Sequence, residues 1–518
     1  MSREHLFAEV PPRRAPASNG GHQRRIRLGL ERFRQLAAAG YHYIPVYSEQ
    51  PYDLENPAAF FTRLTEGKGR FLLESFEQGH QRSRYSFIGW TPLLTMKASG
   101  DEFTVMEKNR VTVSKGDPLT ELKKKLDGLE VAPIPELGPF YGGAVGYIGY
   151  DYVRQIQKLP DRTRPLTNLP DLYWVVPQYL VRIDHVAQKI TVIVLAVVDP
   201  ADITGSYEKA VQDLVMINNR LARTLPMPPL PNAVPTQHPV SRLTTLSRPE
   251  FMDLVAQAKA HIHSGEVGQV VLSQRIIQEY TGDPFGFYRV LRSLNPSPYL
   301  FYLDFGDHQL AGSSPETMVR LEDGLVTLKP IAGTRHRGET TADDERLRRE
   351  LLNDEKELSE HMMLVELGRN ELNRVCRFGS IRIAELMTVE FYSHVMHLVS
   401  TLQGELLPAY SGVDLIRAVF PAGTLSGAPK QRALEIIEAL EPTRREFYGG
   451  CVGYLGFNGN LDTCITIRTV LFYGHQAHLQ VGAGIVAASE PAKEYEETLN
   501  KAAALIIALN RAQGRATS

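Results

Sequence analysis

Cysteine is scarce in this chain, and long hydrophobic runs are missing altogether. The three cysteines, Cys376, Cys451 and Cys464, have no metal-ligand spacing and are too few for a disulfide framework. We therefore expect a reducing, cytoplasmic setting. The longest apolar run, Ile190 to Val198, has only the length of a strand. The sequence thus predicts no membrane-spanning segment.

Neither sign of charge is in excess. Lys and Arg number 57 against 59 Asp and Glu, which gives no basis for binding to nucleic acid or to a membrane surface. A hydrophobic fraction of 43% and a charged fraction of 22% are typical of a soluble globular protein. Residues 1–30 combine Arg with Pro, Gly and Asn and lack the apolar core of a signal peptide. They are predicted to form a disordered tail, the alternative being a cleaved targeting segment.

A proline-rich stretch divides the chain. Six prolines between Leu225 and Pro239 exclude regular helix and central strand there. We interpret residues 226–243 as a connector between an N-terminal half, 31–225, and a second half, 244–510. Strands and helices do not alternate as βαβ units in either half, so an α+β fold is favoured.

Hydrophobic periodicity indicates several elements. Strand-like segments occur at Ile190–Val198, Gln269–Arg275 and Ala477–Val481. Apolar residues at helical spacing run from Asp344 to Phe378, with Gly379 as a stop signal. A last helix is predicted after Ser489 and Pro491, which are start signals.

One ten-residue pattern occurs twice. Phe140 to Gly149 reads FYGGAVGYIG, and Phe447 to Gly456 reads FYGGCVGYLG. Glycine at this density inside strand-like sequence permits close backbone approach or a bulge. Coincidence is hard to sustain over ten positions, so we predict two equivalent strands packed in one sandwich.

The pattern Lys-Glu-x-x-Glu also occurs twice, at Lys356–Glu360 and Lys493–Glu497. Both copies lie in helical sequence, where a spacing of three places the two carboxylates on one face. If the two faces met, four carboxylates would repel one another, and Mg²⁺ is the natural ion to neutralise them. The alternative is a set of ordinary i,i+4 ion pairs on solvated helix faces.

Three glycine-containing segments offer backbone N–H groups to an anion. They are Leu328–Gly338, with a turn at Gly333; Phe420–Lys430, before a helix starting near Pro429; and a loop at Gly482–Gly484. Arg468 is able to hold a carboxylate by a bidentate contact. Together with the acidic pairs, these segments describe a site for a small polyanionic ligand bridged by a divalent metal.

These residues are also where a family becomes recognisable. The second half resembles the chorismate-utilising enzymes, and the chain from about Leu30 is similar to the large subunits (component I) of anthranilate synthases. The matching motifs are Ser314–Thr317, Pro330–Thr334, Asp354–His361, His394–His397, Phe420–Lys430, Thr466–Thr469, Gly482–Gly484 and Glu494–Lys501. The resemblance implies a large mixed or antiparallel β-sandwich flanked by helices.

The resemblance also implies roles for individual residues. Glu360 and Glu497 would bind Mg²⁺ directly, with Glu357 and Glu494 acting through water, and the metal would hold the ring carboxylate of chorismate. Residues expected to contact the rest of the substrate are Gly333, Thr334, Tyr448, Arg468, Gly482, Ala483 and Gly484.

The resemblance assigns the chemical steps to three further side chains. Glu316 would be the general acid that protonates the departing C4 hydroxyl, for which burial must raise its pKa. Thr424 would hydrogen-bond that hydroxyl. His397 would assist proton transfer and pyruvate elimination, although a lone histidine in an apolar stretch is otherwise usually a satisfied core residue.

Two positions select among the reactions of the family. Members that add water have a lysine just before the Val-Val-Leu strand, where this chain has Gln269, an amide that cannot act as a base. Aminodeoxychorismate synthases have a lysine where this chain has Ala332. The resemblance thus implies ammonia addition and anthranilate as product; the alternatives are an aminodeoxychorismate synthase and a catalytically silent, tryptophan-binding regulatory subunit.

Two partners are also expected. None of the cysteines lies in a Gly-x-Cys-x-Gly context, so the ammonia would come from a separate glutamine amidotransferase subunit. The segments Leu72–Ser75 and Asn295–Leu300 resemble the family's feedback pocket for L-tryptophan. The residues implied to contact this inhibitor are Ser75, Pro298, Tyr299 and Leu300.

Overall fold

The computed structural model describes residues 26–52, 55–75, 84–107, 110–223, 229–230, 242–392 and 395–514. Most of the predicted tail and connector lie outside these ranges. Helix α1 (Leu30–Ala38) begins at the last residue of the predicted tail, and strand β9 (Arg242–Thr244) includes the last two residues of the predicted connector. In the described ranges, no helix is both long and apolar enough to cross a membrane.

The strands form two large sheets, and every ladder between the described strands is antiparallel. The first sheet runs in the order β1 (Tyr43–Pro51), β8 (Lys189–Val197), β7 (Leu172–Asp184), β3 (Tyr85–Ser99), β2 (Arg70–Glu74), β11 (Tyr299–Asp304), β12 (His308–Ser314), β21 (Thr469–Tyr473), β22 (Gln476–Ile485), β10 (Gln269–Glu279) and β9. The predicted α+β sandwich is confirmed, in its antiparallel form.

The second sheet shares two strands with the first. Its order is β5 (Arg110–Lys115), β4 (Glu102–Glu107), β3, β7, β6 (Gly143–Ile148), β19 (Cys451–Gly456), β20 (Leu461–Ile465), β13 (Thr317–Glu322), β14 (Leu325–Leu328), β17 (Val395–Glu405) and β16 (Arg382–Phe391). Strand β15 (Ile331–His336) also pairs with β17, and β18 (Gly427–Ala428) pairs with β10.

Strands β3 and β7 belong to both sheets because each continues through an irregularity. The register of their ladder shifts between Pro92 and Leu94, opposite Pro177. Thr91 has a φ of 56° at the same place. Proline cannot donate to a ladder, so the pairing is interrupted here and the two long strands change sheets.

The repeated ten-residue pattern forms the centre of the second sheet. Strands β6 and β19 pair so that Gly146 lies opposite Gly453, its own counterpart in the repeat. A side chain at either position would overlap the backbone of the next strand, at Tyr173 or Asp462. The predicted equivalence of the two strands is confirmed, and an approximate two-fold relation between the halves follows from this pairing.

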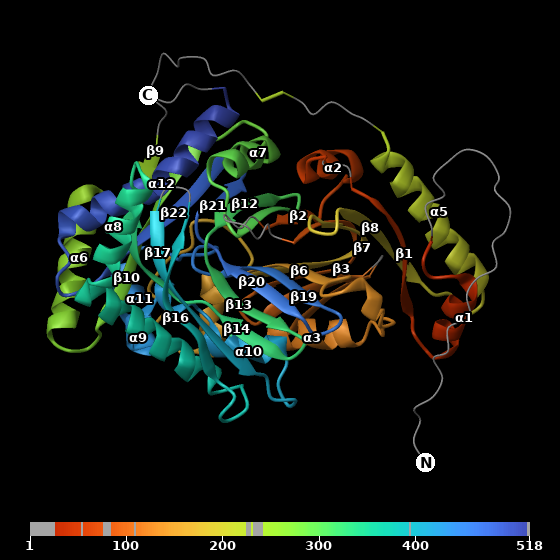
Figure 1. Cartoon of the computed structure of the whole chain (residues 1–518), viewed down its shortest axis with the longest axis horizontal. Helices are drawn as coiled ribbons and strands as arrows, with labels where there is room; N and C mark the ends of the chain where they lie inside the picture. Colours follow the sequence, from red (N-terminus) through yellow and green to blue (C-terminus); the bar gives the residue numbers. More distant parts are fainter. Residues whose placement is uncertain are drawn as a thin grey trace.

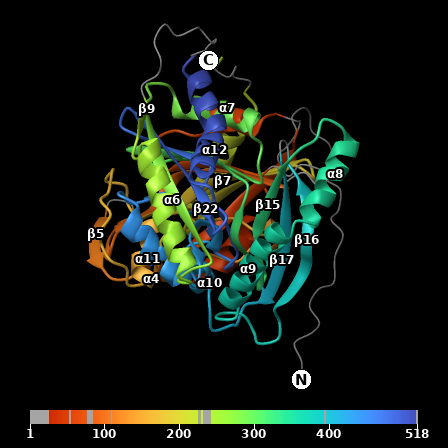
Figure 2. The same cartoon turned by 90° about the vertical axis from the view of Figure 1, so that its left-hand side faces the viewer.

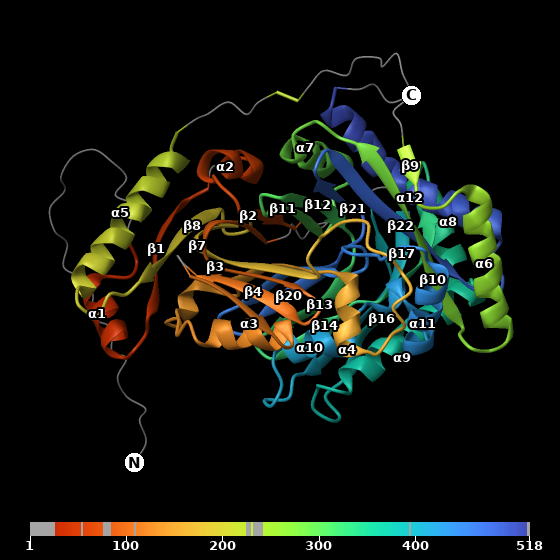
Figure 3. The same cartoon turned by 180° about the vertical axis from the view of Figure 1, so that it is seen from behind.

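Helices cover the outer faces of the sheets (Figures 1 and 3). In the N-terminal half, α2 (Pro57–Leu64) contacts β2 and α5 (Ile203–Leu221) lies on β8. In the second half, α6 (Arg248–His263), α7 (Pro284–Leu294), α11 (Lys430–Leu440) and α12 (Pro491–Ala512) lie on the first sheet. Helices α8 (Thr341–Leu352), α9 (Glu355–Leu372) and α10 (Gly412–Val419) lie against the second sheet, where α10 also contacts α3 (Pro118–Asp127). Figure 2 looks onto the side where α6, α9, α11 and α12 lie.

One helix prediction needs correction. The periodic segment from Asp344 to Phe378 is two helices, α8 and α9, because the Asp354 side chain caps a new N-terminus by accepting a hydrogen bond from Glu357 N (3.2 Å). Helix α9 ends at Leu372, so Gly379 is not its stop. Helix α12 begins at Pro491 as predicted, and both Lys-Glu-x-x-Glu segments are helical, in α9 and α12.

Candidate active site

The chain crosses between the two sheets at two adjacent points. Strand β12 of the first sheet continues into β13 of the second through Pro315 and Glu316, and β20 continues into β21 through Arg468. Hydrogen bonds join the crossings: Ile465 N donates to Glu316 O (3.0 Å), and Ser313 N donates to Arg468 O (3.1 Å). The segments 313–316 and 465–468, separated by about 150 positions in sequence, are therefore held side by side where the chain passes from one sheet to the other.

Glu316 is buried, with 8% of its surface exposed. Burial raises its pKa to about 8, while the Thr424 hydroxyl, which donates a hydrogen bond to Glu316 Oε1 (2.8 Å), acts in the opposite direction. Thr424 is held in the short 3-10 helix η3 (Gly423–Leu425). A carboxyl group in this environment keeps its proton at neutral pH, which is the state that a general acid requires.

Arg468 has an unusual backbone conformation, and its charge has no partner among the described residues. Its φ of 49° lies in the left-handed region, which is uncommon for a residue with a long side chain. Its guanidinium group forms no hydrogen bond or ion pair with any other described residue, and burial lowers its pKa. Because a desolvated charge without a partner is costly, the arrangement suits an anionic ligand.

The predicted loop at Gly482–Gly484 is wrong: these residues are in strand β22, paired with Val271 to Ser273 of β10. A side chain at Gly482 would come within 2.8 Å of the Tyr448 hydroxyl, and one at Gly484 within 2.7 Å of Gln269 Nε2. Glycine is therefore required for close approach inside a strand rather than for a turn.

Gly333 is likewise part of a strand. It lies in β15 with a φ of 70°, at a shift of register between Ala332 and Thr334, so the predicted turn is a β-bulge. A side chain at Gly333 would lie 3.3 Å from Glu357 Oε2 on α9. The bulge thus brings the backbone of β15 next to the first acidic pair.

His397 on β17 is held by this bulge. Its Nδ1 lies 2.9 Å from Thr334 Oγ1 and 3.3 Å from Gly333 O. A carbonyl oxygen only accepts, so the proton is assigned to Nδ1 and Nε2 keeps its lone pair. Burial, together with the positive charges of Arg468 and Lys501, lowers the pKa of His397 to about 4. The ring is neutral at pH 7 and has a free basic nitrogen.

Lys501 on α12 belongs to the same cluster. Its Nζ donates a hydrogen bond to Gly482 O (2.9 Å) and lies 2.8 Å from Glu497 Oε1, and its charge acts on the pKa of both Glu316 and His397. The sequence analysis gave Lys501 no role of its own: it was the last residue of the matching segment Glu494–Lys501 and one member of an i,i+4 ion pair with Glu497. Its position one helical turn after Glu497, on the same face, was the signal that it reaches the site.

The two acidic pairs influence one another. The pKa of Glu360 is raised by burial and by the charges of Glu357 and Glu494, and the pKa of Glu494 is raised by burial and by Glu497. Lys356 lies 3.7 Å from Glu360. The predicted convergence of α9 and α12 carboxylates is therefore seen in their electrostatics.

The acidic residues fit an open metal site, in which the protein supplies only some of the ligands. Among the described residues, no three acidic, histidine or cysteine side chains are close enough to form a metal cluster. Mg²⁺ is commonly held by only one or two carboxylates, with water and substrate oxygens completing its octahedron. The carboxylates of Glu360 and Glu497 suit such a site, because the remaining ligands do not have to come from the protein.

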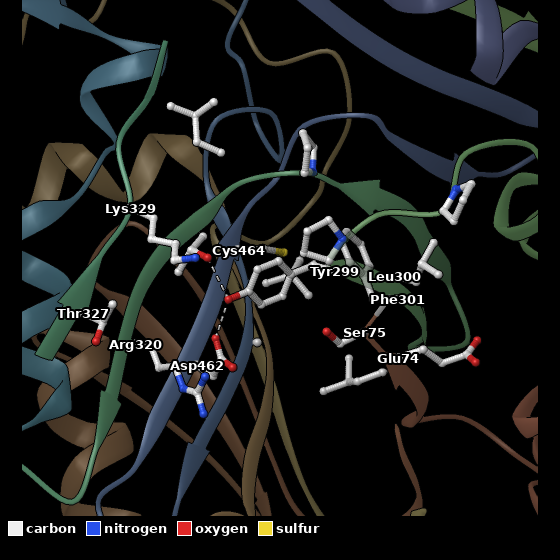
Figure 4. Close-up of a pocket in the computed structure, with 18 of the residues that line it drawn as sticks. Glu74, Ser75, Tyr299, Leu300, Phe301, Arg320, Thr327, Lys329, Asp462 and Cys464 are labelled. Carbon is white, nitrogen blue, oxygen red and sulfur yellow. Dashed lines mark hydrogen bonds between the residues drawn. The ribbon is translucent and has the colours of Figure 1, made fainter. Parts of the chain in front are cut away.

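The four residues predicted to contact an inhibitor come together elsewhere. Ser75, Pro298, Tyr299 and Leu300 line a cavity of about 500 Å³ next to the paired strands β2 of the N-terminal half and β11 of the second half (Figure 4). The Tyr299 hydroxyl donates to Asp462 Oδ1 (2.8 Å) at its floor. This cavity does not include the catalytic side chains described above, so two separate sites are formed.

The sequence matches one protein family and several characterised relatives over most of its length. The family model described as chorismate binding enzyme matches residues 68–506. The anthranilate synthase component 1 of Acetivibrio thermocellus is 43% identical over 483 residues, covering 92% of this chain and 97% of that protein. The anthranilate synthase component 1 of Synechocystis sp. is 44% identical over 506 residues, covering 93% and 99%.

Two solved structures are similar to this chain over most of its length. Anthranilate synthase component I from Streptococcus pneumoniae superposes with a TM-score of 0.73 at 34% identity, covering 88% of this chain and 98% of that one. The menaquinone-specific isochorismate synthase from Escherichia coli has a TM-score of 0.69 at 20% identity and shares the fold.

Proposed function

Because this chain belongs to the chorismate-binding enzymes, and within them to the anthranilate synthase component 1 group, we propose that it converts chorismate and ammonia to anthranilate and pyruvate at the cluster around Glu316. The observation that carries the proposal is the buried Glu316, whose raised pKa favours the protonated form and which accepts a hydrogen bond from Thr424, on a segment paired with the one that carries Arg468. An acid at neutral pH and an anion-binding charge are the two groups that this substrate requires.

The side chains divide the reaction between them. Ammonia adds at C2 of chorismate, and the C4 hydroxyl leaves as water with the proton of Glu316. His397, with its free Nε2, then assists loss of the C2 proton, and the enolpyruvyl group is expelled as pyruvate. Gln269 is not a base for activating water and Ala332 is not a nucleophile, so direct attack by ammonia is the path these residues leave open.

Residues on the segments around Glu316 would bind and orient the substrate. Arg468 and the backbone of Gly482–Gly484 would bind the carboxylate of the enolpyruvyl group, and Thr424 would bind the C4 hydroxyl. Mg²⁺, held by Glu360 and Glu497 with Glu357 and Glu494 behind water, would supply positive charge for the ring carboxylate.

Three further features complete the proposal. A glutamine amidotransferase subunit supplies ammonia, which the designation component 1 in the relatives supports. L-tryptophan inhibits by binding the 500 Å³ cavity, whose lining includes Ser75, Pro298, Tyr299 and Leu300. The enzyme works in the cytoplasm, consistent with three free, buried cysteines.

The test is to incubate the purified chain with chorismate, Mg²⁺ and ammonium and to identify the product. Fluorescent anthranilate is expected. A 4-amino product would favour an aminodeoxychorismate synthase, isochorismate would also overturn the proposal, and absence of turnover would favour a silent regulatory subunit.

The metal is tested with neighbouring glutamates on α12. Glu497→Gln is expected to raise the Mg²⁺ concentration needed for half-maximal rate by about tenfold or more. Glu496→Gln is the matched control, because its carboxylate pairs with Arg248 (3.2 Å) on another face of the helix. Equal effects in both variants would remove the metal assignment.

A further inference from the structure

Arg445 is almost fully buried, with 1% of its surface exposed, and it contacts three parts of the catalytic cluster. Its Nη1 donates to Leu425 O (2.6 Å), the residue after Thr424. Its Nη2 donates to Val271 O (2.7 Å) on β10. Its guanidinium carbon lies 5.8 Å from the centre of the Tyr448 ring. One side chain thus joins the Thr424 segment, strand β10 and Tyr448.

Glu441 fixes the guanidinium in this position. Arg445 Nε donates to Glu441 Oε2 (2.9 Å) and Nη2 to Oε1 (2.6 Å), a bidentate pair in which both partners are buried. Ser273 donates to the same carboxylate through its backbone N (2.8 Å) and its hydroxyl (2.9 Å). Ser273 lies directly opposite Gly482 in the ladder. The pair is therefore tied to the strand that lies beside Tyr448.

The N-terminal half also holds this pair. The Tyr150 ring, which follows β6, lies 4.7 Å from the Arg445 guanidinium carbon. Glu446, the residue after Arg445, accepts hydrogen bonds from Leu166 N and Thr167 N (both 2.8 Å) through its carboxylate. Its backbone N donates to Asp151 Oδ2 (2.9 Å). Docking of residues 150–167 thus fixes the segment that carries Arg445.

We propose that Arg445, clamped by Glu441, is a positioning residue that sets Thr424 against Glu316 and Tyr448 against Gly482, and that the N-terminal half acts on the chemistry through it. Within the part of the chain that the structure describes, the Arg445 side chain donates only to carbonyl oxygens and to one carboxylate. The inference rests on the proposed function for the step that is positioned, but the positioning itself is a property of the fold.

The test compares two buried arginines. Arg445→Lys keeps the positive charge, but a lysine ammonium cannot donate hydrogen bonds to Leu425, Val271 and Glu441 in the geometry of the guanidinium. Arg63→Lys is the matched control: Arg63 is 8% exposed, pairs with Glu55 and donates to Leu221 O (2.7 Å) in the N-terminal half, away from the catalytic cluster. With ammonia as substrate, Arg445→Lys is expected to lower kcat by about tenfold to a hundredfold and to raise KM for chorismate, as misplacement of catalytic groups does.

A pH profile and hydrogen exchange separate positioning from general loss of stability. The Thr424 hydrogen bond lowers the pKa of Glu316, so loosening Thr424 moves the alkaline limb of kcat to higher pH. Amides of residues 423–427 should exchange faster in Arg445→Lys and remain protected in Arg63→Lys. Ser273→Ala, which removes no charge, should change both readouts in the same direction by a smaller amount and serves where Arg445→Lys does not fold.

The outcomes are distinct. The positioning role is overturned if Arg445→Lys has wild-type kinetics and wild-type hydrogen exchange. Where Arg445→Lys does not fold, the same result in Ser273→Ala overturns it. Equal losses of activity and of amide protection in Arg63→Lys also overturn it. A wild-type chain that makes no anthranilate overturns the proposed function instead. In that case faster exchange at residues 423–427 still supports the positioning role, and unchanged exchange overturns it.

Discussion

Replacing Glu316 by Gln should inactivate the enzyme and stabilise its fold at the same time. The variant removes the proton that the proposed acid delivers, so kcat should fall by about 10² to 10⁴. Gln keeps the size of the side chain and an oxygen that accepts from Thr424. It differs from Glu mainly in having no charge to bury.

The stabilisation follows from the pKa of Glu316. An exposed glutamate in the unfolded chain loses its proton near its ordinary value of 4.5, whereas burial in the folded protein raises the pKa to about 8. The folded state therefore binds more protons than the unfolded state between these pH values, and stability falls as pH rises through this window. One pKa unit corresponds to about 1.4 kcal/mol, so the cost is about 3 kcal/mol at pH 7 and about 5 kcal/mol above pH 8.

Thermal unfolding at several pH values measures this difference. Glu316→Gln should match the wild type near pH 4.5 and exceed it at pH 7 by about 3 °C for cooperative unfolding of a chain of this length. Glu322→Gln, at the far end of strand β13, which follows Glu316, controls for loss of a carboxylate because Glu322 is partly exposed and paired with Arg320 (2.5 Å). A difference that does not change with pH, or an active Glu316→Gln, would refute the assignment of Glu316 as a buried acid.

Three other predictions concern binding. Arg468→Lys should raise KM for chorismate by about tenfold or more, measured by steady-state kinetics, because an ammonium cannot reproduce a bidentate contact; an unchanged KM would contradict the carboxylate contact. The rate in wild type should rise with pH as His397 loses its proton near pH 4 and fall as Glu316 ionises near pH 8, measured as a kcat profile; a flat profile would contradict both roles. Ser75→Phe should raise the inhibition constant for tryptophan by about tenfold or more by filling the cavity, measured against the variant's own uninhibited rate; unchanged inhibition would place tryptophan elsewhere.

Local sequence patterns predicted the elements better than their arrangement. The Pro491 start of α12, the helical Lys-Glu-x-x-Glu segments and the equivalence of β6 and β19 all depend on signals within ten to twenty residues. Propensity and spacing encode such signals directly. The break between α8 and α9 was missed because the apolar spacing continues across Asp354, and only the capping geometry shows that a new helix begins there.

Glycine was the main source of error. At Gly333 and Gly482 the prediction was a turn or loop, yet both residues are in strands, one at a bulge and one facing Tyr448. The sequence signal is the same in both situations, namely a position where a side chain is not tolerated. What excludes the side chain is a neighbour far away in sequence, so the local pattern does not distinguish the two.

The side-by-side placement of the segments that carry Glu316 and Arg468 was beyond local reasoning for a related reason. The chain passes from one sheet to the other both between β12 and β13 and between β20 and β21. The registers of the β12–β21 and β13–β20 ladders bring these two connections next to each other. Arg445 was missed altogether because arginine in a helix-to-strand connection normally indicates a solvated surface residue. Its role depends on Leu425, Val271 and Glu441 meeting in space.

The connection between β12 and β13 suggests how the proposed inhibitor in the separate cavity would lower the rate of the proposed reaction. Pro315 and Thr317, the residues on either side of Glu316, line the 500 Å³ cavity together with Ser75 and Leu300. A ligand there touches the backbone that carries the proposed acid without touching the acid itself. The Thr424 contact to Glu316 is 2.8 Å long, and a hydrogen bond weakens steeply when its geometry is lost. A small displacement of this crossing is therefore enough to separate Glu316 from the group that orients it, which is why we expect occupancy of the cavity to lower kcat.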